Sequence, residues 1–306
     1  MSNSSSLKLF SGTSHPSLAH QISCWLGIPL LAASIGRLPS REISVLNKES
    51  VGQADIYVLG AASSPACTTN SSLMELLVMI HSCSIALAGR ITAVFPHFPY
   101  VQQDKKDKLR APITAKLVAN MIREAGAHHV ITMELHASQI QGFFNCPVDN
   151  LYAKPTLVQY IKEHVNVGNS VIVSPVAAGA KRVLSIAAKP DLDFALFHKE
   201  QNKANKVSRM VLVGSVKGKT AILVDDMRLE LARATEVIAL VSHGIQSGPA
   251  MANVNKSRIA KLVVTNTIPQ HDHLEACQRL ACVDSSFIFF HLWFQFQLQM
   301  SSGFFQ

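Results

Sequence analysis

Short runs of apolar residues alternate along the chain with longer stretches that have helical periodicity. Most of these runs are apolar at every position, which is typical of strands buried on both faces of a sheet. Ten strands are predicted, at residues 7–10, 55–59, 91–95, 130–134, 171–174, 194–197, 210–213, 221–224, 237–241 and 262–265. The main predicted helices span residues 16–26, 72–88, 113–125, 153–164 and 178–188. Alternation of this kind indicates parallel sheets with helices on both faces, so we predict an α/β fold.

The length of 306 residues suits two domains of about 150 residues each. We place the boundary between the fourth and fifth strands, which gives an N-terminal domain at residues 1–148 and a C-terminal domain at 149–284. A Phe/Gln-rich tail at residues 285–306 has a distinct composition, since it contains seven of the 14 phenylalanines. Its apolar stretch is interrupted by polar residues and is shorter than the roughly 20 residues that a spanning helix needs. We therefore expect no membrane-spanning segment.

Composition narrows the class of protein. Apolar residues make up 48% of the chain and charged residues 16%, as expected for a compact globular protein. The net charge of +8 favours anionic partners, but no clustered basic or aromatic face points to nucleic acid. The six cysteines show no CxxC spacing. The serine-rich start lacks the charged region followed by an apolar region that is typical of a secretory signal. We expect reduced thiols and a cytoplasmic protein.

Adjacent carboxylates follow the predicted strand 221–224, at Asp225 and Asp226. Ligands of parallel sheets bind beyond the carboxyl ends of the strands. Two adjacent carboxylates repel each other, so the pair is electrostatically unfavourable unless a cation or a polyhydroxyl ligand binds to it. The hydroxyls of a sugar or a water bound to Mg²⁺ would suit this pair. Residues 174–182 open a helix after another strand, where free backbone N–H groups favour an anion.

Two further strand ends carry polar groups. Glu134 and His136 stand two residues apart on an extended segment and point to the same side, where a neutral imidazole can bind a metal. A single histidine at a strand end is more often structural, so this signal is weak alone. Residues 96–107 combine amide, carboxylate and ammonium groups on a frame stiffened by prolines and aromatics. This segment is either a purine site or an ordinary solvent loop.

Long motifs between Leu7 and Asp284 resemble ribose-phosphate pyrophosphokinase (phosphoribosyl pyrophosphate synthetase) of the animal type. The matching segments are residues 10–12, 98–100, 104–108, 110–113, 115–121, 135–144, 147–152, 211–214, 221–227, 243–245 and 263–270. The resemblance implies two tandem phosphoribosyltransferase-like domains with the active site between them. It also implies assembly of dimers into larger rings.

The resemblance further implies a reaction and its residues. The anomeric hydroxyl of ribose 5-phosphate attacks the β-phosphorus of Mg·ATP, which gives phosphoribosyl pyrophosphate and AMP. Lys199 would be the catalytic mobile-loop lysine that neutralises charge on the transferring group. The implied binding residues are Gln103, Asp104, Asp107 and Glu42 for ATP, Asp225 and Asp226 for ribose phosphate, and His136 and Glu134 for Mg²⁺.

The chain departs from the family pattern at several of these places. Gln102 and Gln201 stand where the family has arginines, and Val176 replaces an aspartate that shares the metal and sugar site. Residues 38–42 lack the Phe and Asn of the family's ATP-binding FSNQE run. Only fourteen residues, 228–241, separate Met227 from Ser242, too few for the family's 5-phosphate loop, a helix and a strand. We expect that the phosphate loop is deleted.

Two hypotheses remain open. The first is the family reaction, carried out by a homo-oligomer that binds ATP and ribose 5-phosphate. The second is a non-catalytic homologue, either a structural or regulatory subunit in a hetero-oligomer with active synthetase or the product of a decayed gene copy. The departures affect metal, ATP and ribose phosphate separately, which favours the second, while the resemblance most directly implies the first. A phosphoribosyltransferase would need the same phosphate loop, which argues against that class.

Overall fold

The computed structural model describes residues 7–60, 67–106, 108–174, 179–203, 206–225 and 235–290. Side chains from Phe197 to Val211 and that of Asp225 lie outside this description. The chain divides into two compact units. Unit 1 contains residues 1–152, 267–269 and 285–306, and unit 2 contains residues 153–266 and 270–284.

Unit 1 is built on a five-stranded parallel sheet in the order β1-β4-β5-β6-β7. A separate antiparallel hairpin is formed by β2 and β3. The elements are β1 (Leu7–Ser11), α1 (Pro16–Leu26), β2 (Ala33–Arg37), β3 (Ile43–Asn47), β4 (Asp55–Leu59), α2 (Thr69–Ile85), β5 (Arg90–Phe95), α3 (Thr114–Ala125), β6 (His129–Met133), the 3₁₀ helix η1 (Ser138–Phe143) and β7 (Val148–Leu151).

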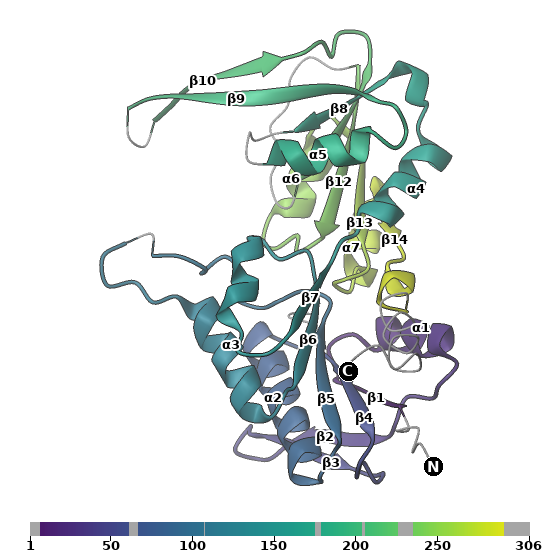
Figure 1. Cartoon of the computed structure of the whole chain (residues 1–306). Helices are drawn as coiled ribbons and strands as arrows, with labels where there is room; N and C mark the ends of the chain where they lie inside the picture. Colours follow the sequence, from purple (N-terminus) through teal and green to yellow (C-terminus); the bar gives the residue numbers. More distant parts are fainter. Residues whose placement is uncertain are drawn as a thin grey trace, which may run out of the picture. The chain divides into compact units, whose positions relative to one another are not determined.

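Both faces of this sheet are covered, because successive side chains of each strand point to opposite sides. Ile56 and Val58 of β4 belong to the large core formed with α2 and α3. Tyr57 and Leu59 face a small space that is also lined by residues of α1. Figure 1 shows α2 and α3 together on one side of the sheet and α1 on the other.

Local signals set the helix ends in unit 1. Pro16 occupies the first turn of α1, where its missing N–H costs nothing, and Gly27 ends the helix with φ +65°. Gly126 ends α3 in the same way, with φ +117°. A left-handed backbone of this kind favours glycine because it has no Cβ.

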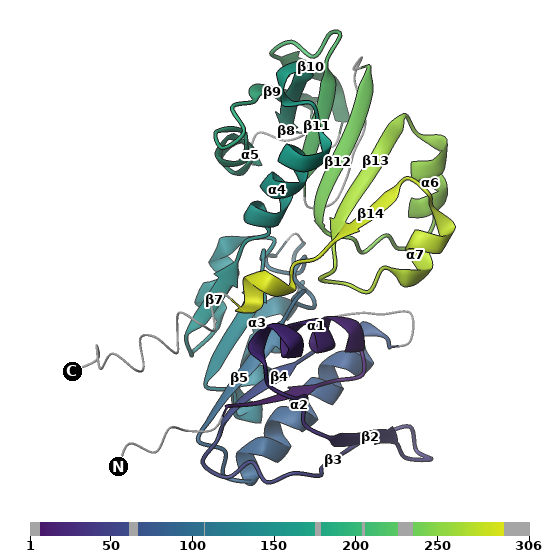
Figure 2. The ribbon, with the colours of Figure 1, turned by 90° about the vertical axis from the view of Figure 1, so that its right-hand side faces the viewer.

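Unit 2 contains a seven-stranded sheet in the order β10-β9-β8-β11-β12-β13-β14, parallel except for the β9–β10 pair. Figure 2 shows α4 and α5 on one side of this sheet and α6 and α7 on the other. The elements are α4 (Lys154–His164), the 3₁₀ helix η2 (Val167–Asn169), β8 (Ser170–Ser174), α5 (Ala180–Ala187), β9 (Asp193–Lys203), β10 (Lys206–Val213), β11 (Thr220–Asp225), β12 (Glu236–His243), α6 (Ala250–Lys256), β13 (Ile259–Thr265), α7 (His271–Ala276) and β14 (Leu280–Val283).

The predicted α/β fold class is confirmed, and all ten predicted strands and the five main helices are present. The β9–β10 pair differs from expectation, since its strands are longer than predicted and antiparallel. Figure 1 shows this hairpin extending beyond the other strands of its sheet. Within the described ranges, no helix combines the length and apolar character needed to cross a membrane.

Candidate functional site

The loop after β5 is held in place by buried aromatic rings. Phe98 is only 1% exposed, and its ring lies 5.5 Å from the rings of both Phe95 and Phe144. Tyr100 adopts φ +56°, and its hydroxyl donates to the side chain of Asn70 on α2. The loop therefore has a fixed course between the sheet and α2, whereas its polar tip is exposed.

Gln103 joins this loop to the start of α3. Its side-chain oxygen accepts a hydrogen bond from the Thr114 hydroxyl at 2.6 Å, and its carbonyl accepts from the N–H of Ala115 at 3.2 Å. The side chain remains exposed to solvent beyond these contacts. Asp104 is half-buried on the same loop, and Asp107 lies outside the described residues.

Glu134 and His136 follow β6, the strand next to β5. Glu134 is 7% exposed and adopts φ +44°, and its N–H donates to the carbonyl of Leu151 at 2.9 Å. His136 is exposed two residues later. Because the carboxyl ends of parallel strands meet at one edge, the structure brings these two residues to the same edge as the loop that carries Gln103 and Asp104.

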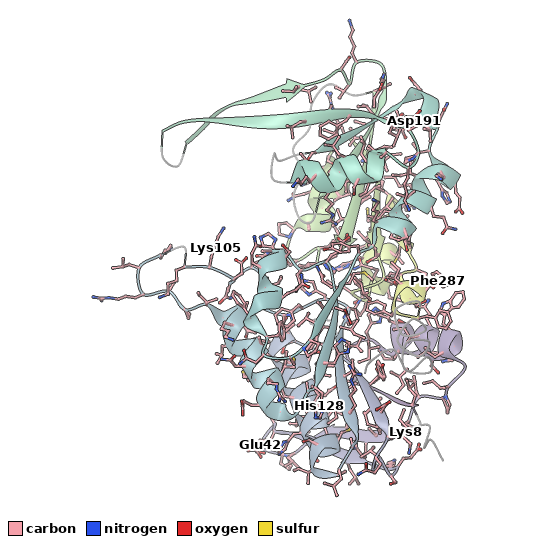
Figure 3. The ribbon with its side chains drawn as sticks, in the orientation of Figure 1. Lys8, Glu42, Lys105, His128, Asp191 and Phe287 are labelled. Atoms are coloured by element: carbon pink, nitrogen blue, oxygen red, sulfur yellow. The ribbon has the colours of Figure 1, made fainter. Side chains whose placement is uncertain are left out.

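Glu42 lies elsewhere in unit 1. It follows the turn between β2 and β3, where its carboxylate accepts a hydrogen bond from the Ser40 hydroxyl at 2.7 Å. Figure 3 shows Glu42 toward the end of the sheet where Lys8 and His128 lie, and Lys105 on the loop at the opposite end. Within unit 1, therefore, Glu42 does not join the other predicted ATP residues.

Sequence reasoning missed Glu75, a buried carboxylate beside the end of β1. Glu75 is 5% exposed and accepts hydrogen bonds from the N–H and the hydroxyl of Thr13, the latter at 2.8 Å. A Cβ on Gly12 would lie 2.6 Å from the Glu75 carboxylate, so a larger residue at position 12 would displace that side chain. The available signal was a lone acid in the otherwise uncharged run of α2, Thr69–Ile85.

In unit 2 the strand order reverses at β8, which has β9 on one side and β11 on the other. Ser174 ends β8 and is fully buried, and Asp225 ends β11 in register with Val241 of β12. At the same edge, Arg182 of α5 donates a hydrogen bond to the Ser242 hydroxyl at 2.8 Å. The structure thus places a guanidinium near the carboxyl ends of these strands, which the sequence analysis did not single out.

Several predicted positions of unit 2 are described only in part or not at all. Lys199 lies within β9, paired with Met210, and not in a loop, because the run continues as a strand through pairing with β10. Asp226, Val176 and residues 227–234 lie outside the described residues, as does the place where the phosphate loop was expected to be missing. Gln201 also lies in β9, and its side chain is not described.

Comparison with known proteins identifies the family. Residues 7–126 match the model for the N-terminal domain of ribose phosphate pyrophosphokinase, and residues 202–292 match the phosphoribosyl synthetase-associated domain. The chain is 51% identical over 297 residues to ribose-phosphate pyrophosphokinase 2 of Schizosaccharomyces pombe, covering 92% of each chain. The chain belongs to the ribose-phosphate pyrophosphokinase family.

A solved structure agrees with this assignment. The crystal structure of phosphoribosylpyrophosphate synthetase from Mycobacterium smegmatis superposes with a TM-score of 0.84 at 33% identity, covering 94% of this chain and 97% of that one. The two tandem phosphoribosyltransferase-like domains predicted from the sequence are therefore those of a ribose-phosphate pyrophosphokinase fold.

The metal site implied by the family was tested against the side chains of unit 1. Among the described residues, no group of three or more His, Cys, Asp or Glu side chains forms a complete protein cage. Mg²⁺ usually keeps several waters and binds substrate phosphates through only one or two protein ligands. Glu134 supplies one buried carboxylate and His136 one exposed imidazole at this edge, and both are donor types that a divalent cation can accept.

The cysteines of this pyrophosphokinase family member are all free thiols. Burial, followed by repulsion from the nearby Asp284 carboxylate, raises the pKa of Cys282 to about 11. Burial also raises the pKa of Cys67 and of Cys83. These three side chains therefore stay protonated at neutral pH and are poor nucleophiles.

Proposed function

We propose that this chain transfers diphosphate from Mg·ATP to ribose 5-phosphate, giving phosphoribosyl pyrophosphate and AMP. The observation that carries the proposal is its 51% identity, over 92% of each chain, to a ribose-phosphate pyrophosphokinase. In the reaction, the anomeric hydroxyl of the sugar releases its proton, and its oxygen forms a bond to the β-phosphorus of ATP. The bond between the β-phosphorus and the oxygen bridging to the α-phosphorus breaks, and AMP leaves with that oxygen.

Unit 1 would bind Mg·ATP at the carboxyl edge of its sheet. Gln103 and Asp104 offer amide and carboxylate groups to the nucleotide from a loop fixed by buried aromatics. Glu134 and His136 would hold the magnesium ion, which supplies charge neutralisation for the phosphates. We assign Asp107 to the same nucleotide site on the strength of the family motif. Glu42 would bind the ATP of a neighbouring copy of the chain, as the family's loop does, since it lies at the opposite end of its own unit 1.

Unit 2 would bind ribose 5-phosphate where its strand order reverses. Asp225 and Asp226 would accept hydrogen bonds from the sugar hydroxyls, a role suited to carboxylates beyond a strand end. Lys199 would neutralise negative charge on the diphosphate as it moves between oxygens. These roles are carried over from the family pattern to the matching positions of this chain.

Assembly and location follow the same family argument. We propose that copies of the chain form a homo-oligomer or a hetero-oligomer with active synthetase subunits. The six free thiols favour a reducing compartment, and we place the protein in the cytoplasm.

None of the reported comparisons with known proteins favours the non-catalytic hypothesis. The arguments that the chain has lost a metal ligand and the 5-phosphate loop depend on Val176 and on the residues after Met227. Val176 and residues 227–234 lie outside the described residues. The decisive experiment measures AMP release by purified protein supplied with Mg·ATP and ribose 5-phosphate. We expect AMP only when both substrates are present, and no AMP above the blank would overturn the proposal in favour of the non-catalytic one.

A matched control separates transfer from contaminating hydrolysis. Lys199→Ala should lower AMP release by at least tenfold because it removes a positive charge from the transferring group. Lys189→Ala changes a lysine just beyond α5 and should leave the rate unchanged. Equal rates in the two variants would mean that the AMP arises elsewhere.

A further inference from the structure

Helix α1 carries a histidine and a cysteine that the roles assigned above leave unused. His20 and Cys24 are both exposed, and residues four apart lie on the same side of a helix. Cys24 is the only exposed cysteine of the six in the chain. Figure 2 shows α1 in front of the sheet of unit 1, with its outer side toward the viewer. We call these two residues the His20–Cys24 pair.

The spacing of the pair matches two ligands of one metal ion. The Nε2 atom of His20 lies 3.7 Å from the Sγ atom of Cys24. Tetrahedral zinc lies about 2.0–2.1 Å from a histidine nitrogen and about 2.3 Å from a cysteine sulfur, so two such ligands are about 3.6 Å apart. Imidazole and thiolate are both ligand types that suit zinc. The helix therefore holds both atoms at the separation that the ion requires.

One copy of the chain supplies only half of such a site. Structural zinc sites usually have four protein ligands. In the part of the chain that the structure describes, no three His, Cys, Asp or Glu side chains gather closely enough to hold a metal ion. A symmetric dimer uses the same surface patch on both copies. A two-fold axis beside α1 would therefore bring a second His20–Cys24 pair to the same ion and complete a Cys₂His₂ set.

Apolar surface lies next to the pair. Trp25 follows Cys24 directly, and its ring lies 5.2 Å from that of Phe287, with each residue 49% exposed. The indole N–H of Trp25 donates to the hydroxyl of Ser286 at 3.0 Å, which fixes the orientation of the ring. Aromatic residues are enriched where proteins contact one another. A second copy that approaches the exposed side of α1 would thus bury apolar surface as well as complete the metal site.

We propose that His20 and Cys24 form half of a tetrahedral zinc site, which a second copy of the chain completes with the same two residues. Each thiol releases its proton to solvent when its sulfur binds the ion, so two thiolates balance the charge of one Zn²⁺. His20 binds through Nε2 as a neutral imidazole. The site links two copies through α1, and its formation does not depend on the reaction proposed above.

The test titrates Zn²⁺ into the untagged full-length chain, after its metal has been removed and with its thiols kept reduced. Calorimetry should show saturation at one zinc ion for two chains. In sedimentation experiments, zinc should raise the average mass of the dilute protein, and chelation with EDTA should reverse the rise. Co²⁺ in place of zinc should give the visible absorption of a tetrahedral ion together with a thiolate-to-cobalt charge-transfer band.

Two variants and a matched control locate the site. Cys24→Ser and His20→Asn should each lower zinc affinity about 100-fold or more, since even residues that only orient a metal ligand contribute 10–100-fold. Both variants should also lose the zinc-dependent rise in mass, while their thermal midpoints without metal should match that of the parent chain. His271→Asn is the control, because exposed His271 lies 3.5 Å from the Glu275 carboxylate one turn along α7, without a sulfur ligand. It should leave zinc binding and mass unchanged.

Three results would overturn the proposal. Saturation at one zinc ion per chain, with no rise in mass, would mean that water and not a second copy completes the coordination. Zinc affinity that is equal in the parent chain, Cys24→Ser and His20→Asn would place the metal elsewhere. No zinc binding at all would mean that the short distance between His20 and Cys24 reflects only a hydrogen bond to sulfur. None of these readouts measures turnover, so their failure is distinct from failure of the proposed reaction.

Discussion

In unit 1 the strand order β1-β4-β5-β6-β7 runs in one direction along the chain, whereas in unit 2 the order reverses at β8. Parallel α/β sheets bind ligands beyond the strand ends where the order reverses, because loops diverge there and leave a crevice. Unit 2 has such a point between β8 and β11, whereas the order of the five named strands described in the unit 1 sheet does not reverse. Unit 1 instead carries its candidate residues on the loops after β5 and β6.

This difference separates two ways of building a site. In unit 1, side-chain packing holds the loops, as the contacts of Phe98 and Glu75 show. In unit 2, strand pairing holds the candidate residues. Asp225 ends β11, which pairs with β12 along one edge and with β8 along the other. Substitution of a buried anchor in unit 1 should therefore lower the free energy of unfolding. Substitution at a strand end in unit 2 should instead weaken substrate binding.

The largest effect is expected from Phe98→Ala. Removing a fully buried aromatic ring costs about 3–5 kcal/mol of unfolding free energy. The thermal midpoint should fall by about 10 °C in scanning calorimetry, and the KM for Mg·ATP should rise. Leu109→Ala is the matched control, because Leu109 is 94% exposed nearby and should change the midpoint very little. An unchanged midpoint in Phe98→Ala would show that the ring is not an anchor.

Asp225→Ala should act on the other unit and on catalysis. Loss of a charge-assisted hydrogen bond to a sugar hydroxyl is expected to lower kcat/KM for ribose 5-phosphate about 100-fold, or about 2.7 kcal/mol. The KM for Mg·ATP should change little, which steady-state assays of AMP release would establish. Asp225→Asn keeps an acceptor and should lose less. If the KM for Mg·ATP rose as much as the KM for ribose 5-phosphate, Asp225 would not act on the sugar alone.

The fold was predictable where local signals are strong. Residues 55–59 were predicted to the residue, because an apolar run needs no partner to be recognised as a buried strand. Strands β2 and β3 were missed because they alternate between half-buried and exposed positions and contain Ser34 and Gly36. Strand β7 was missed because it contains Asp149 and Asn150 among its four residues.

The candidate site was predictable to a smaller extent. Glu134 was found from its position after a strand and Gln103 from the family resemblance, and the structure places both at one edge. Glu75 was not found, since its role depends on the approach of Thr13 from sixty-two residues away in sequence. The long β9–β10 hairpin was underestimated for the same reason, because pairing between strands extends residues that lack strong strand propensity alone.

Glu75→Leu should have an intermediate effect. The substitution leaves the Thr13 N–H and hydroxyl without their acceptor in a part-buried place, which costs about 1.5–3 kcal/mol. Urea unfolding would measure the change as a lower transition midpoint. Glu75→Gln retains one acceptor oxygen and should lose about half as much. If both variants were as stable as the parent chain, the carboxylate would not fix the end of β1.

The smallest effect tests whether Gln103 binds nucleotide or only starts α3. Its side-chain oxygen accepts from Thr114, and its amide nitrogen remains for a ligand. Gln103→Ala removes both groups and should lower stability by about 1 kcal/mol and raise the KM for Mg·ATP several-fold. Gln103→Glu keeps the acceptor for Thr114 but replaces the donor with a negative charge. It should therefore keep the parent's stability and still raise the KM for Mg·ATP, because the carboxylate repels the triphosphate. A KM that rises in Gln103→Ala but not in Gln103→Glu would assign Gln103 to the helix alone, and the loop after β5 would then act in unit 1 only as a support.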